Sequence, residues 1–237
     1  MAAMTSLEQV QVRSVDAVVA RMRELRRSLP PGDGVGYFNA VYLSVTEEVA
    51  RRLRSKYFTD PVVAAELDVR FARRYLHAVE ADLQGSRISA CWRPLFQVRG
   101  HPRIHALQFA LAGINAHIGH DLALAVSDTC RSRGLPPGEL EDDFRRVGEV
   151  LTELEERVRE ELMPGPDLLD VADPLTHLVD SWSLERARDA AWATACVLWR
   201  LRDLPDFAEE FTQRLDKSIG LVSRFLLTPV RGGQPAR

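Results

Sequence analysis

The stretch that decides the fold is residues 101–134, HPRIHALQFALAGINAHIGHDLALAVSDTCRSRG. Apolar residues occur on every side of a helix drawn through it. This pattern is typical of a central helix that other helices surround, whereas a surface helix has one polar face. We therefore predict one long buried helix over about residues 102–132, ending near Gly134.

Amphipathic helices are expected on both sides of this stretch, because apolar residues recur there every three or four positions. One helix start is predicted at Val15. Two more are predicted at Asp60-Pro61 and Asp173-Pro174, because in each pair an N-cap residue precedes proline. We find no convincing strand pattern and no internal repeat. The prediction is an all-α, single-domain bundle of about seven helices around the central one. An N-terminal helix (1–29) should be continuous with the domain (30–227), and residues 228–237 should form a disordered tail.

The composition narrows the class of protein. The 237 residues are 46% hydrophobic and 27% charged, with 34 acidic and 31 basic residues and a net charge of −3. Such a chain has no basic field for nucleic acid, and no run of about 18 apolar residues predicts a membrane span. The N-terminus lacks the apolar core of a signal peptide. Three cysteines at irregular spacing (Cys91, Cys130, Cys196) fit a cytoplasmic protein with reduced thiols.

The central helix carries unusual polar residues, of which His117 and Asp121 lie one turn apart. Small residues precede them on the same stripe (Ala106, Ala110, Gly113), which predicts either a closely packed neighbouring helix or a cavity. The pair could orient a general base, contribute to a metal site, or satisfy its own polar groups inside the core. These three interpretations stay open at this point.

Two carboxylates on other helices help to decide among these three interpretations. Asp68 lies on the apolar side of its helix and is expected to be buried and paired, whereas Glu48 borders an apolar side and could form a surface salt bridge. If both converge with His117 and Asp121, a site exists. His101, His105 and His120 are left open, because His105 and His120 are too far apart along the helix to share one ion.

Several segments resemble a known family. They include Phe38-Asn39-x-x-Tyr42, Leu67-Asp68-x-x-Phe71-Ala72-x-x-Tyr75, Ala187-Arg188-Asp189-x-Ala191-Trp192 and, most specifically, Asn115-Ala116-His117-Ile118-x-x-Asp121-Leu122. Across about residues 30–200, the chain resembles a helical family from actinobacteria and relatives, catalogued only as a domain of unknown function. The resemblance implies an all-α fold and lends weight to six residues: Asn39, Asp68, Asn115, His117, Asp121 and Arg188. It argues against a site of four histidines, since positions 101, 105 and 120 are not typically histidine in that pattern.

The leading hypothesis is an enzyme with a hydrophobic pocket inside the bundle that performs acid/base chemistry without a cofactor, as a cyclase, isomerase or lyase does. The expected catalytic residues are His117, Asp121, Asp68 and Asn115, and the expected substrate contacts are Asn39, Tyr42, Gln108, Tyr75, Trp192 and Arg188. The substrate would be a hydrophobic small molecule, and a homodimer is an open alternative.

Two other classes of function are carried alongside it. One is a metal-dependent hydrolase or oxygenase that binds a divalent ion through His117, Asp121, Asp68 and Glu48. The other is a non-catalytic ligand-binding protein whose polar residues form a network in the core.

Overall fold

The computed structural model describes residues 13–162 and 183–229, and every regular element in these ranges is a helix. This confirms the all-α prediction. The α-helices are α1 (Val15–Ser28), α2 (Gly34–Leu53), α3 (Pro61–Leu83), α4 (Arg93–Val98), α5 (Ala106–Ala116), α6 (Ala123–Arg133), α7 (Glu141–Leu162), α9 (Leu184–Arg200) and α10 (Pro205–Leu226). A π-helix, η1 (His117–Leu122), joins α5 to α6, and a 3₁₀ turn, η2 (Pro137–Leu140), precedes α7.

Caps explain where several of these helices begin and end. Asp60 accepts hydrogen bonds from the N–H groups of Val62 and Val63 at the start of α3, as predicted. The central helix ends at Gly134, which has the left-handed φ of 65° that glycine adopts readily. Several predictions lie outside the described residues: the cap at Asp173-Pro174, the first part of the helix expected after it (175–182), residues 1–12 and most of the expected tail (230–237).

The central helix differs from the prediction in two ways. It begins at Ala106 rather than near residue 102, because residues 101–105 form a turn closed by the Gln108 side chain, which accepts from the His105 N–H. It is also not α-helical throughout, since the six residues of η1 are wound as a π-helix. Such π-bulges hold an extra residue per turn and are frequent at functional sites.

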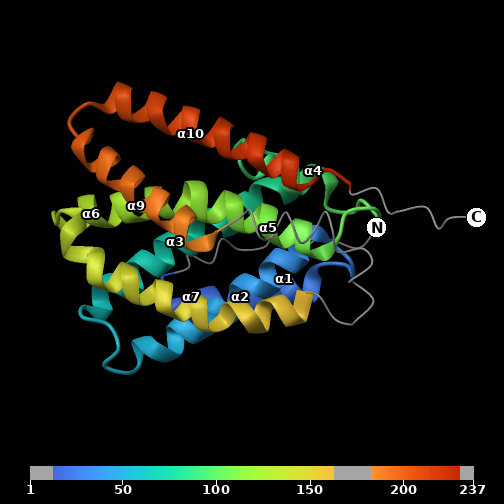
Figure 1. Cartoon of the computed structure of the whole chain (residues 1–237), viewed down its shortest axis with the longest axis horizontal. Helices are drawn as coiled ribbons and strands as arrows, with labels where there is room; N and C mark the ends of the chain where they lie inside the picture. The colour runs from blue at the N-terminus through green and yellow to red at the C-terminus, as the bar shows by residue number, and fades with distance from the viewer. Residues whose placement is uncertain (1–12, 163–182, 230–237) are drawn as a thin grey trace, which may run out of the picture.

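The central helix is enclosed by its neighbours. It lies between α10 on one side and α2 on the other, and α7 crosses α2 in this view and contacts it (Figure 1). The stripe of small residues (Ala106, Ala110, Gly113) was expected to allow either a closely packed neighbouring helix or a cavity, and it lies next to both. A Cβ on Gly113 would lie 2.4 Å from the Phe38 ring of α2, so Gly113 allows close packing, while Ala110 lines a cavity. By length and composition Ala106–Arg133 could cross a membrane, but 83% of its apolar window is buried, as in core helices of water-soluble proteins, so the evidence for a span is weak.

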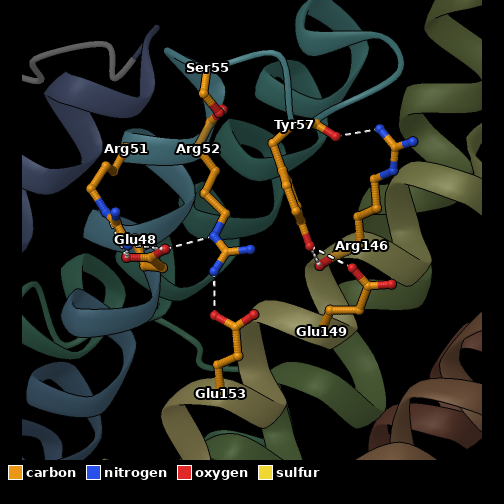
Figure 2. Close-up of polar contacts among 8 residues, drawn as sticks. All are labelled: Glu48, Arg51, Arg52, Ser55, Tyr57, Arg146, Glu149 and Glu153. Carbon is orange, nitrogen blue, oxygen red and sulfur yellow. Dashed lines mark hydrogen bonds and ion pairs between the residues drawn. The ribbon is translucent and has the colours of Figure 1, made fainter.

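A polar network attaches α7 to α2 and to the loop after it (Figure 2). Glu48 accepts hydrogen bonds from Arg51 and Arg52, and Arg52 also pairs with Glu153 of α7. The Tyr57 hydroxyl donates to Glu149 over 2.6 Å. Glu48 therefore forms a salt bridge, as one interpretation of the sequence expected. Through Arg52 it is part of the network that links α2 to α7.

Candidate functional site

A cavity of about 940 Å³ opens among α2, α3, α5, α7 and α9. Its described lining is mainly apolar and includes Val45, Leu67, Phe71, Leu111, Ile114 and Trp192. Three buried polar atoms on its lining residues have no hydrogen-bond partner among the residues that the structure describes: the Tyr42 hydroxyl, Asp68 Oδ2 and His117 Nε2. Buried polar groups are normally hydrogen-bonded, so three exceptions around one cavity are unusual.

A hydrogen bond to Asp121 orients the His117 ring. Its Nδ1 lies 3.0 Å from Asp121 Oδ2, and both side chains are buried. Because a carboxylate can only accept, Nδ1 carries the proton and Nε2 keeps its lone pair. Nε2 is the nitrogen without a partner, and His117 lines the cavity. This geometry is that of an oriented general base.

Asp121 accepts three hydrogen bonds. The donors are Trp92 Nε1 at 2.9 Å, His117 Nδ1, and His120 Nδ1 at 2.9 Å. Burial by itself would raise the pKa of Asp121, but the hydrogen bonds and charges of the two histidines hold it well below its usual range. Asp121 is therefore ionised and fully satisfied by protein groups.

The His117 ring is packed among aromatic side chains. It stacks on Phe71 with ring centroids 3.6 Å apart and an interplanar angle of 8°, and the Tyr42 ring lies 4.4 Å away. Burial lowers the pKa of His117, although Asp121 acts in the opposite direction. The imidazole is therefore neutral near pH 7. Phe71 appears in one of the family-like segments, but only the contacts in the fold identify Phe71 and Trp92 as supports of His117 and Asp121.

Asp68 differs from the prediction in one respect. Its Oδ2 is buried, as expected, but no described residue pairs with its carboxyl group by a hydrogen bond or an ion pair. Burial raises the pKa of Asp68 to about 7. Near pH 7 the same cavity therefore contains a carboxyl group that is about half protonated and a neutral imidazole, and these groups can act as an acid and a base.

Tyr42 connects the two groups. Burial, and next the charge of Asp68, raise the pKa of Tyr42 well above its usual value, so the hydroxyl keeps its proton. Its ring contacts His117 on one side, and its hydroxyl is within electrostatic reach of Asp68 on the other. Tyr42 is thus the predicted substrate contact that the structure places next to both titrating groups.

Arg188 and Trp192 of α9 are also on the lining of the cavity. The Arg188 guanidinium is buried, donates to the Phe144 carbonyl oxygen of α7 and lies 4.3 Å from the Phe144 ring centroid. Burial lowers the pKa of Arg188 to about 10, so it remains a cation near pH 7. No carboxylate among the described residues forms an ion pair with it.

Four other predicted residues are engaged elsewhere. Asn39 donates to the Met22 carbonyl and accepts from the Tyr75 hydroxyl. Gln108 donates to the carbonyls of Leu226 and Thr228, and Asn115 donates to Ile219 O and Ser223 Oγ. These amides join α1 to α2 and α5 to α10. None of Asn39, Tyr75, Gln108 and Asn115 is on the described lining of the cavity.

The metal-ligand set considered from the sequence is not assembled around the cavity. Glu48 is not on its described lining and pairs with two arginines. Asp121 accepts from three donors and lies behind His117. Among the remaining histidines, His101 accepts from the Arg103 N–H, His105 stands at the start of α5, and His120 shares Asp121 with His117.

Comparison with known proteins identifies one family. The model of a family of unknown function (DUF5995) matches residues 15–229, which is nearly the whole described chain. No curated protein and no solved structure matches the sequence. The match spans α1 to the end of α10 and therefore includes every residue of the cavity described above. The chain belongs to the DUF5995 family of unknown function.

Proposed function

We propose that this protein is an enzyme that transfers a proton on an apolar small molecule held in the cavity, without a cofactor. The observation that carries the proposal is the set of three unpartnered polar atoms, on Tyr42, Asp68 and His117, around one apolar space. Leaving a buried polar group without a partner costs about 1–3 kcal/mol. A ligand that hydrogen-bonds to these atoms would recover part of that cost on binding.

His117 is the proposed general base. Its Nε2 lone pair accepts a proton from carbon, and the imidazolium that forms is stabilised by ionised Asp121 at 3.0 Å from Nδ1. Asp121 is a positioning residue in this scheme, because it contacts His117 rather than the substrate.

Asp68 is the proposed general acid. As a neutral carboxyl group it donates its proton to a carbonyl oxygen of the substrate while His117 removes a proton from the adjacent carbon, giving an enol. Where a carbon–carbon double bond is conjugated with the enol, the His117 imidazolium returns its proton to the far end of that double bond, while Asp68 recovers its own proton from the enol oxygen, and the double bond is shifted. Tyr42 would donate a further hydrogen bond to the same oxygen.

Arg188 points to the class of substrate. A buried cation is costly without a carboxylate partner, and no described carboxylate pairs with Arg188. A ligand carboxylate would pair with its guanidinium fork. We therefore expect an apolar molecule that carries one carboxylate and one carbonyl group.

The test is hydrogen exchange at carbon. The untagged protein is incubated in D₂O with a panel of apolar keto acids, and deuterium at carbon is followed by NMR. The wild-type protein should accelerate exchange for at least one member. His117→Gln should slow it about 100-fold or more, because general base catalysis contributes at least that much. His77→Gln, which removes an exposed histidine of α3, is the matched control and should leave the rate unchanged.

The non-catalytic binding protein is the second candidate, favoured by the complete satisfaction of Asp121 by protein donors. Panel members that bind without any exchange above the His117→Gln rate would support it and contradict the enzyme proposal. If no panel member binds or exchanges, the substrate class proposed from Arg188 is wrong as well. The cytoplasmic location and the homodimer remain predictions.

A further inference from the structure

A second group of polar side chains lies next to Asp121, whose Oδ1 contacts one member of the group, His120. Cys91 precedes α4, His120 lies in η1 and Asp216 lies on α10, and each offers one ligand atom within 4.8 Å of the other two. None of the three is on the described lining of the cavity. Whatever this group binds is therefore distinct from the proposed substrate.

His120 is the most informative member. Its side chain is 9% exposed, and its Nδ1 lies 2.9 Å from Asp121 Oδ1. No described residue hydrogen-bonds to its Nε2. A buried imidazole with one nitrogen oriented by a carboxylate and the other left open has the arrangement of a metal-bound histidine, where the carboxylate fixes the tautomer.

Asp216 and Cys91 come from two segments that approach closely. The Asp216 oxygens accept from the N–H groups of Ala90 and Cys91, both at 2.8 Å, and a Cβ on Gly220, one turn later on α10, would lie 2.4 Å from Ala90 O. Each carboxylate oxygen keeps a second lone pair. Anchoring of this loop therefore uses one lone pair of each Asp216 oxygen and leaves the other available to a ligand.

We propose that Cys91, His120 and Asp216 bind one divalent transition-metal ion of the zinc type, with water as the fourth ligand. One thiolate, one imidazole and one carboxylate are donors that zinc commonly takes, and the two anions neutralise its charge in a mostly buried place. Binding releases the Cys91 thiol proton to solvent. Tetrahedral zinc places its ligand atoms about 3.3–3.8 Å apart, so the three side chains need to close by about 1 Å.

The ion would connect three separate elements, the loop before α4, η1 and α10. It would also hold His120 in the orientation in which Nδ1–H donates to Asp121. The site is independent of the proposed function, because proton transfer at His117 requires no metal, and either proposal can fail without the other.

Cobalt(II) is the probe, because a thiolate–cobalt bond absorbs in the near ultraviolet and four-coordinate cobalt absorbs strongly in the visible. Metal-free, untagged protein is titrated with Co²⁺. We expect saturation at one ion per chain with both absorptions, and loss of both when Zn²⁺ is added. Cys91→Ser should abolish the thiolate absorption, and Asp216→Asn should weaken cobalt binding about tenfold or more.

The matched control is the double variant Cys130→Ser/Cys196→Ser, which removes the other two thiols and should retain the full signal. Circular dichroism establishes that each variant is folded, and Asp216→Asn provides the test if Cys91→Ser does not fold. The proposal is overturned if the wild-type protein shows no thiolate–cobalt absorption. It is also overturned if the absorption persists in Cys91→Ser or disappears in the double variant.

Discussion

At the scale of single residues, the most informative feature is the contrast between Asp121 and Asp68. Asp121 is buried and accepts three hydrogen bonds, whereas Asp68 has one buried oxygen, Oδ2, and no described partner. Their pKa values consequently move in opposite directions. An unpaired buried carboxyl group makes folding less favourable, so its presence beside a cavity is better explained by function than by stability.

Asp68→Asn should change the dependence of stability on pH. Because the folded pKa of about 7 exceeds the unfolded value, the folded state binds more protons between about pH 4 and pH 7, and the wild-type free energy of unfolding falls across that window. The asparagine side chain cannot ionise, so the variant should gain stability relative to wild type, on the order of 2 kcal/mol, between about pH 4 and pH 8.

Urea unfolding at the two ends of this pH range measures the gain. Asp128→Asn is the matched control, since Asp128 pairs with Arg74 and is 42% exposed, and its effect should be nearly the same at both pH values. A pH-independent effect of Asp68→Asn would show that Asp68 ionises normally in the folded protein.

At the scale of elements, the π-helical turn and helix α7 shape the cavity. In η1, His117 and His120 bond to different oxygens of Asp121. Helix α7 closes one side of the cavity. Besides the apolar packing of Phe144 and Val150, polar contacts attach it: the network of Figure 2, the Arg188–Phe144 hydrogen bond and the carboxylate of Asp143. Its position therefore depends on buried polar contacts as well as on apolar packing.

Asp143→Ala should destabilise the protein by about 1–3 kcal/mol. The Asp143 side chain is 9% exposed and accepts from the N–H groups of Thr59 at 2.6 Å and Asp60 at 2.8 Å, which would lose their acceptor. Asp142→Ala, at the neighbouring and 68% exposed position, should change stability by less than about 1 kcal/mol. Equal losses for the two variants in chemical denaturation would contradict this account of how α7 is attached.

At the scale of the whole molecule, the bundle surrounds one helix and leaves an apolar space beside it. The outer face of α10 keeps large apolar residues exposed, among them Leu221 at 68% and Phe225 at 70%. Cohesion across the bundle comes from apolar packing supplemented by side-chain amides, as where Gln108 and Asn115 bond to α10. A ligand that occupies the cavity should therefore raise the free energy of unfolding of the whole protein.

An apolar carboxylic acid should raise the melting temperature, because a ligand of the folded state adds about 2.7 kcal/mol at a hundredfold excess over its Kd. The alcohol of the same chain length should have a smaller effect, and Arg188→Gln should remove the difference between acid and alcohol. Arg186→Gln, at an exposed position of the same helix, is the control and should preserve the difference. Equal shifts for acid and alcohol in the wild-type protein would show that Arg188 does not bind the carboxylate.

The sequence by itself determined the helical class, the central helix, the helix starts at Val15 and Pro61 and the proximity of His117 to Asp121, because these depend on periodicity, caps and neighbours along one helix. Which polar residues face the cavity was decided only by tertiary structure. Asn39, Gln108 and Asn115 look like site residues in the sequence, yet each bonds to a segment distant along the chain. The π-helical turn, the unpaired state of Asp68 and the meeting of Cys91 with His120 also depend on contacts between distant segments, which local periodicity does not encode.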